Sequence, residues 1–211
     1  LDISSLNNEA ACLSEDGYID EAIKLLLSTL AAASKHPRQY NDLGILTGEI
    51  AYCMKVSEDF HLPEQTVKFA YNAYKAELPQ SSTTLDLGNI LATIYENTHR
   101  LEEALRLYRD IADVCLKYYP NTNSTATSLN NLANVCETLE MYSEAESLYL
   151  NSLTILHESD DKGIKTAEVL TNIGYLKKKL RDYSGAIKNY QEAFNLIGNS
   201  DNPSWRIKAI T

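Results

Sequence analysis

Long apolar runs are missing from this sequence of 211 residues. The longest ones, at residues 25–27 and 30–33, are far shorter than the ~20 residues that a helix needs to cross a bilayer. No basic segment leading into an apolar run resembles a secretory or transit signal. Because the first residue is Leu1 rather than Met, we expect a fragment or processed chain, from which a targeting segment could be missing. We therefore expect no membrane insertion.

Cysteines are few and scattered. Cys12, Cys53, Cys115 and Cys136 form no CxxC pair and have no histidine spacing that suits zinc. We interpret them as buried thiols within helices, which fits a reducing compartment better than a disulfide scaffold. The sequence thus predicts a cytoplasmic protein without a metal.

Basic residues are outnumbered, with 19 Lys and Arg against 29 Asp and Glu and a formal charge of −10. A phosphate backbone is bound by clustered Lys and Arg. The one short basic run, residues 177–179 followed by Arg181, is interpreted as a solvated helix face. We therefore expect no nucleic-acid partner.

Patterns typical of catalysis are also absent. The histidines form no HExxH motif and lie near no nucleophile pattern. Gly44 and Gly48 lack the strand and the lysine of a phosphate loop, and the pair Asp160 and Asp161 is too sparse for a calcium loop. The chain is expected to be no enzyme, with no catalytic residue and no cofactor.

What the sequence does contain is a repeat of 41 residues. Small residues recur at this spacing, at Ala10, Ala51, Ala92, Ala133 and Gly174. Twelve residues later a second small position follows, at Ala22, Ala104, Ala145 and Ala186, with Pro63 in the second unit. Large residues stand four positions beyond it, at Leu26, Val67, Tyr108, Tyr149 and Tyr190.

Spacings of three and four residues place these positions on one face of an α-helix, so each unit predicts two amphipathic helices joined by a polar turn. We expect an all-α, right-handed superhelical solenoid of about five helical hairpins in one domain. The units are placed at residues 3–40, 41–81, 82–122, 123–163 and 164–202. Residues 203–211 are expected to form a capping helix or the start of a further unit.

Two segments carry a family resemblance. Residues 128–133, SLNNLA, followed by residues 142–149, YSEAESLY, closely resemble the tetratricopeptide repeat (TPR) of the kinesin-light-chain type. Residues 170–174 and 183–186 repeat the pattern. The resemblance implies a protein-binding module whose first helices line the concave face of the superhelix. The second unit departs from the pattern at Pro63, which we expect to be tolerated near the first turn of its helix.

The partner-binding residues that this resemblance implies are polar positions on the outer face of the first helices. An asparagine amide suits this role because it can donate to and accept from a peptide backbone at once. Ordinary solvated positions or hydrogen bonds between repeats are the alternative. The candidates are Asn89, Glu96, Asn130, Asn131, Asn134, Glu137, Asn172, Tyr175 and Lys178.

The acids on these helices, Asp86, Glu96, Glu137 and Glu168, favour neutral to basic partner segments. Only Lys178 and Lys179 form a patch that could accept acidic peptides. We expect a non-catalytic scaffold or adaptor that binds partner peptides or subunits, within a larger assembly. The alternatives are a peptide-sensing regulatory module, or the interaction domain of a longer protein whose catalytic part is absent from this sequence.

Overall fold

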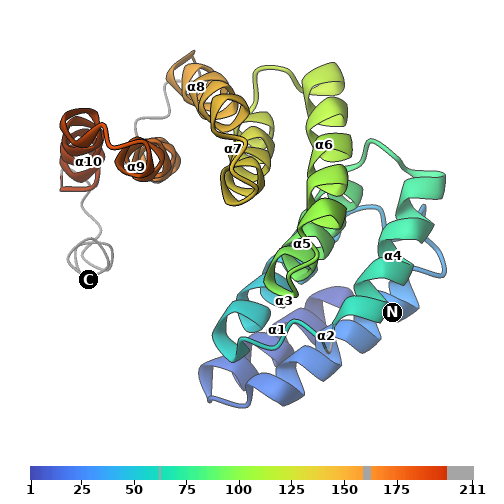
Figure 1. Cartoon of the computed structure of the whole chain (residues 1–211). Coiled ribbons are helices and arrows are strands. Elements are labelled where there is room, and N and C mark those ends of the chain that lie inside the picture. Colours follow the sequence, from blue (N-terminus) through green and yellow to red (C-terminus); the bar gives the residue numbers. More distant parts are fainter. Residues whose placement is uncertain (62, 159–162, 199–211) are drawn as a thin grey trace. The chain divides into compact units, whose positions relative to one another are not determined.

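The computed structural model describes residues 1–61, 63–158 and 163–198. Within them the regular structure consists of helices (Figure 1). They are α1 (Ile3–Glu15), α2 (Ile19–Ala33), α3 (Gly44–Ser57), α4 (Glu64–Glu77), α5 (Ser82–Asn97), α6 (Leu101–Tyr118), α7 (Asn123–Thr138), α8 (Tyr142–Glu158), α9 (Ile164–Lys179) and α10 (Tyr183–Gly198). The predicted all-α class is confirmed. The segment 203–211, expected to form a capping helix or the start of a further unit, lies outside the described residues.

The chain divides into two compact units, Leu1–Ile111 and Ala112–Thr211, with the division inside α6. In the first unit α1 packs on α2, α3 packs on α1, α2 and α5, and α4 packs on α2 and α5. In the second unit α8 packs on α7, α9 packs on both α7 and α8, and α10 packs on α9. In each unit, therefore, first helices are in contact with those of the neighbouring pair.

The turns within the helix pairs repeat the same backbone conformation every 41 residues. After the first helix of each pair stands a residue in the left-handed region, and these residues are Gly17, Glu58, His99, Glu140 and Arg181, with φ between 55° and 88°. At His99 and Glu140 the next amide closes a six-residue turn on the helix, from Arg100 N to Tyr95 O and from Met141 N to Cys136 O, both 2.8 Å. Such closure satisfies the last carbonyls of a helix.

Helix starts follow ordinary capping chemistry. The Ser81 hydroxyl accepts a hydrogen bond from the Thr84 amide at the start of α5. At α7 the cap is Thr122, which accepts from the Thr125 amide.

Packing between paired helices uses the predicted small residues. Ala10, Ala92 and Ala133 are at most 1% exposed. At Gly174 an added Cβ would lie 2.7 Å from the ring of Tyr190, so only glycine allows the present approach of α9 to α10. The small-against-large arrangement is confirmed in these pairs.

The second pair is the exception, and the expectation for Ala51 is wrong. Ala51 is exposed on α3, as are Ile45 and Tyr52. The other second helices begin at positions that the period relates to Phe60, whereas α4 begins only at Glu64, directly after Pro63. A proline further inside the helix would remove a backbone hydrogen bond, so the helix starts after it and not around it.

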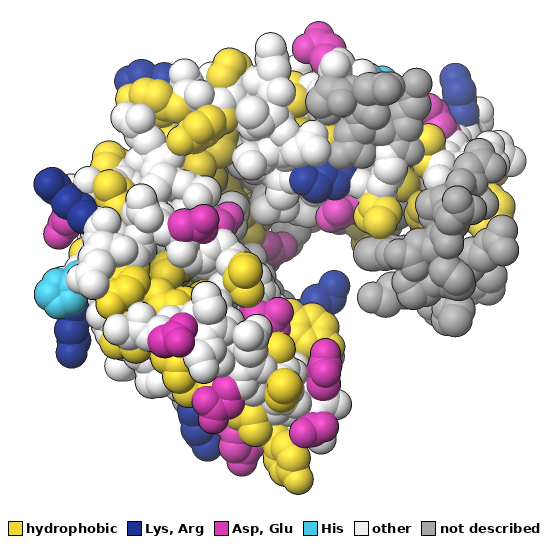
Figure 2. All heavy atoms as spheres, turned by 180° about the vertical axis from the view of Figure 1, so that it is seen from behind, with side chains coloured by type: hydrophobic (Ala, Val, Ile, Leu, Met, Phe, Trp, Pro, Cys, Tyr) yellow, Lys and Arg dark blue, Asp and Glu magenta, His cyan; other side chains and the backbone are white. Residues whose placement is uncertain are grey.

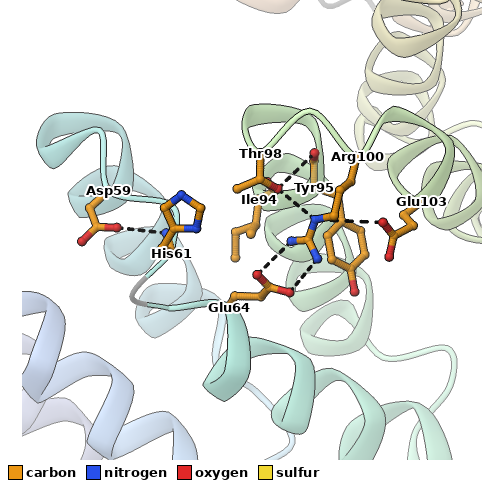
Figure 3. Close-up of polar contacts among 8 residues, drawn as sticks. All are labelled: Asp59, His61, Glu64, Ile94, Tyr95, Thr98, Arg100 and Glu103. Atoms are coloured by element: carbon orange, nitrogen blue, oxygen red, sulfur yellow. Dashed lines mark hydrogen bonds and ion pairs between the residues drawn. The ribbon is translucent and has the colours of Figure 1, made fainter.

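Arg100 secures the late start of α4 from the turn between α5 and α6 (Figure 3). Its guanidinium forms a bidentate ion pair with Glu64, with Nη1 2.9 Å from Oε1 and Nη2 2.8 Å from Oε2. The Arg100 Nε donates to the Thr98 hydroxyl at 3.1 Å, and the guanidinium lies 4.4 Å from the centre of the Tyr95 ring. Planar, bidentate pairing of this kind fixes orientation as well as distance.

The large repeat positions Tyr108 and Tyr149 are buried, whereas Tyr183 at the start of α10 is 60% exposed. Cys12 is exposed and not buried, because it lies on the outer side of α1, whereas Cys53, Cys115 and Cys136 are buried. Within the described residues, no helix combines the length and the apolar character that crossing a bilayer requires.

Candidate partner-binding surface

The candidate residues are divided between the two units. Asn89 and Glu96 lie on α5, in Leu1–Ile111. The remaining candidates lie on α7 and α9, in Ala112–Thr211: Asn130, Asn131, Asn134, Glu137, Asn172, Tyr175 and Lys178. We call this second set the α7/α9 face. Because α7 and α9 are in contact, the structure brings its members onto neighbouring helices.

The first element of the α7/α9 face is an amide pair between hairpins. The Asn172 side chain donates from Nδ2 to Asn130 Oδ1 at 2.9 Å. Asn130 is only 3% exposed, whereas Asn172 is half-buried. Asn130 therefore serves as an inter-repeat contact, as one of the sequence alternatives held, and Asn172 keeps part of its amide at the surface.

The second element is a tyrosine that reaches from the core. Tyr149 on α8 is fully buried, yet its hydroxyl lies 2.6 Å from Asn134 Oδ1 and 3.1 Å from Glu137 Oε2. One hydroxyl proton serves one acceptor at a time, so the two acceptors compete for it. The bonds fix the side chains of Asn134 and Glu137 against the base of the face.

The third element is an ion pair between α7 and α9. Lys179 Nζ lies 2.9 Å from Glu137 Oε1, with the Glu137 side chain 7% exposed and that of Lys179 34% exposed. The Lys179 ammonium also lies 4.9 Å from the centre of the Tyr175 ring. Hydrogen bonding to Glu137 raises the pKa of Lys179, against the opposing effect of burial.

A related arrangement occurs in the first unit, one repeat earlier. The Tyr108 hydroxyl of α6 lies 3.1 Å from the Thr93 hydroxyl and also bonds Glu96. Burial raises the pKa of the Glu96 carboxyl, although this hydrogen bond lowers it in part. Asn89 is half-buried, and its Oδ1 has no hydrogen-bond partner among the described residues.

The part of the α7/α9 face open to solvent is small and mixed in chemistry. Tyr175 is 49% exposed and Lys178 is exposed, while Asn131 and Asn134 are half-buried. An aromatic ring, a cation and neighbouring amides can together contact an extended polypeptide through stacking, charge and backbone hydrogen bonds. Among the described residues, no group of three His, Cys, Asp or Glu side chains could hold a metal ion.

The sequence did not predict two contacts of the α7/α9 face. Tyr149 was assigned to the core alone, and Lys179 was regarded as available to acidic peptides, although it is bound to Glu137. The contact of Tyr149 with Glu137 could have been predicted from the sequence, because Glu96 and Tyr108 repeat the same pair of residue types at the same spacing one unit earlier. No comparable signal announced Lys179, because its partner lies one repeat away.

Comparison with known families agrees with this arrangement. Models described as tetratricopeptide repeat match residues 82–158 and 167–199, together about half of the chain. The chain belongs to the tetratricopeptide-repeat family. No curated protein sequence matches it significantly.

Solved structures show the same TPR-like solenoid fold at low sequence identity. A putative kinesin light chain of Podosopora anserina with nearly identical TPR-like repeats is 15% identical, with a TM-score of 0.71, covering 92% of this chain and 94% of that one. BtubC (BKLC) of P. vanneervenii is 20% identical, with a TM-score of 0.69 and coverage of 86% and 76%. The apo quorum sensor NprR of B. thuringiensis is 16% identical, with a TM-score of 0.67, and this chain covers 56% of it.

Proposed function

We propose that this TPR protein is a non-catalytic scaffold or adaptor that holds a partner polypeptide on the α7/α9 face. The observation that carries the proposal is the fixed polar floor of this face. Glu137 is bound to both Tyr149 and Lys179, and Tyr175 and Lys178 are exposed on the same helix as Lys179. A surface whose side chains are already ordered loses little conformational entropy when a partner binds.

The structure also refines the proposed partner. Two of the four acids that favoured basic segments are engaged, because Glu137 is paired with Lys179 and Glu96 lies beside Tyr108. On α9 the exposed acid Glu168 is balanced by the exposed Lys178. We therefore propose a polar, near-neutral segment, recognised chiefly by amide and aromatic contacts.

Two features of the molecule guide the experiment. Asn130 is buried and holds Asn172, so Asn130→Ala would test stability and binding together. Asn131 is half-buried on α7, and Tyr175 is half exposed on α9. The variant Asn131→Ala/Tyr175→Ala therefore removes contact groups while leaving the polar floor intact.

The test is an affinity pull-down from native lysate, with bound proteins identified by mass spectrometry. The matched control is Gln191→Ala/Asn195→Ala, which alters two exposed polar residues of α10. We expect the first variant to lose specific partners that the control and the unmodified chain retain, with helicity equal in all three by circular dichroism. Equal partner sets in all three proteins would place binding elsewhere.

A peptide-sensing regulatory role is the second candidate, and the fold shared with the quorum sensor NprR is what favours it. The two readings differ in partner size. A sensor binds a short free peptide in the absence of any other protein, whereas a scaffold retains a folded partner through washing. Isothermal titration with peptides from digested partners distinguishes them.

A further inference from the structure

An exposed apolar stripe runs along α10. Tyr183, Ile187 and Phe194 are 60%, 56% and 58% exposed, and their spacing of four and seven residues places them on one helix face. Single exposed apolar residues are ordinary, but three large ones aligned on one helix are characteristic of an interaction surface.

The repeat shows what this face accommodates. One period before Phe194 stands Leu153 of α8, which packs against a cluster that includes Ala167 and Leu170 of α9. Ala167 and Leu170 are both 1% exposed. The corresponding side of a second helix therefore receives the first helix of the following hairpin. The α10 stripe has the geometry to receive another such helix.

The complementary surface lies on α1. Four periods before Ala167 and Leu170 stand Ile3 and Leu6, which the structure leaves half-buried. Leu1, beside them, is 55% exposed. α1 thus carries apolar residues at the positions by which α9 packs on α8.

Charge favours contact between these two surfaces. The segment from α1 to α2, residues 3–33, is acidic, with Lys24 against Glu9, Glu15, Asp16, Asp20 and Glu21, and Lys35 and Arg38 follow α2. Figure 2 shows Asp and Glu side chains gathered over the lower part of the face in view. The last described hairpin is basic, with Lys165, Lys177, Lys178, Lys179, Arg181 and Lys188 against Glu168, Asp182 and Glu192. Opposite potentials steer association and select its orientation.

We infer that α1 of a second copy of this chain docks on the α10 stripe, so that copies associate head to tail. Ile3 and Leu6 of one copy contact Tyr183, Ile187 and Phe194 of the other. Because the two surfaces differ, the contact is heterologous, and each copy keeps one unused surface for a further copy. Contacts of this head-to-tail kind build rings or open chains of molecules.

Sedimentation equilibrium of the 211-residue chain tests this inference. We expect a mass that rises with concentration above the 23.6 kDa of one copy and falls toward it in high salt, because salt screens the charged surfaces. Phe194→Asp and Leu6→Asp should each reduce the mass to that of one copy. The control Leu150→Asp alters an equally exposed leucine of α8 outside the stripe and should associate as the unmodified chain does.

Mixing the two variants gives the sharper result. The Phe194→Asp protein retains an intact α1 and the Leu6→Asp protein an intact α10 stripe, so an equimolar mixture should form a dimer and stop there. Dimer formation also shows that both variants are folded. A chain that stays monomeric at all concentrations overturns the inference. Normal association of Leu6→Asp also overturns the inference, because the α10 stripe then binds something other than α1. Association of only a chain ending at Gly198 overturns it as well, because residues 199–211 then occupy the stripe.

Discussion

Lys179 on α9 neutralises Glu137 on α7 through a contact of 2.9 Å, so a charge of one hairpin is balanced by the next. The pair lies where the family resemblance implied a free acid for partner binding. Its carboxylate also accepts from Tyr149, which anchors it to a third helix. Much of the polar character of this face therefore stabilises the array itself.

Replacing Lys179 by methionine should lower the free energy of unfolding by about 1 to 2 kcal/mol. The change leaves the buried Glu137 carboxylate without its cation, and the partial exposure of Lys179 limits the loss. The folded state raises the pKa of Lys179 above its ordinary 10.5, so the stabilisation is present below pH 10.5 and is lost as pH rises through the raised value. Urea unfolding at neutral and alkaline pH measures both effects.

The matched control is Lys178→Met, which removes the neighbouring exposed charge. It should change stability by less than about 0.5 kcal/mol. Equal losses in the two variants would show that helix propensity or net charge, and not the pair with Glu137, accounts for the effect.

Glu96→Gln should raise stability at neutral pH by roughly 0.5 kcal/mol. Burial raises the pKa of this carboxyl above its ordinary 4.5, so the folded state binds the proton more tightly than the unfolded state does. The unmodified chain therefore gains stability as pH falls from neutral through the raised value, with no further gain below 4.5. The advantage of Glu96→Gln should shrink over that same range.

Thermal unfolding of Glu96→Gln and of the unmodified chain, at several pH values from neutral to mildly acidic, measures this difference in stability. The control Glu102→Gln alters an exposed acid at the start of α6 and should show no such convergence. A stability advantage of Glu96→Gln that persists at acidic pH would argue that burial of the charge is not its cause.

The left-handed turns offer a prediction of opposite sign at two equivalent positions. Glu140 has φ 59°, a left-handed conformation that costs energy for a residue with a Cβ atom but not for glycine. Glu140→Gly should therefore stabilise the chain by about 0.5 to 1 kcal/mol. Gly17 has φ 88°, and an added Cβ would meet nothing within 4 Å, so Gly17→Ala should destabilise it by about 1 kcal/mol through backbone strain alone. Denaturant unfolding checks both, and equal signs would contradict the shared turn geometry.

Much of this fold could be predicted because the repeat constrains it several times over. Ala92, Ala133 and Gly174 each indicated a close helix pair, and each is buried. The prediction for the second pair was wrong although Ala51 fits the repeat pattern. Pro63 shifts the start of α4, and the effect of a proline on the packing of neighbouring helices does not follow from residue spacing. The left-handed backbone at Glu58, His99, Glu140 and Arg181 could not be predicted either. Among the five turn positions, only Gly17 is of a residue type that indicates a positive φ.

The binding surface was less predictable than the fold. The face of a helix follows from its period, but whether a polar residue on it is free depends on contacts with other repeats. Asn130 with Asn172, and Glu137 with Lys179, are both pairs between α7 and α9. These contacts between side chains of different repeats form only when the hairpins have stacked, so the spacing within one helix does not predict them.

Arg100 gives the clearest test of how the irregular second pair is held. Arg100→Lys keeps the charge but loses the bidentate contact with Glu64 and the stacking on Tyr95, so we expect a loss of about 1 to 2 kcal/mol in the free energy of unfolding. Hydrogen exchange should increase first in α4, because Glu64 stands in its first turn. The control Arg106→Lys changes an exposed arginine of α6 and should leave exchange in α4 unaltered. Equal protection of α4 in both variants would mean that its contacts with α2 and α5, and not Arg100, hold it in place.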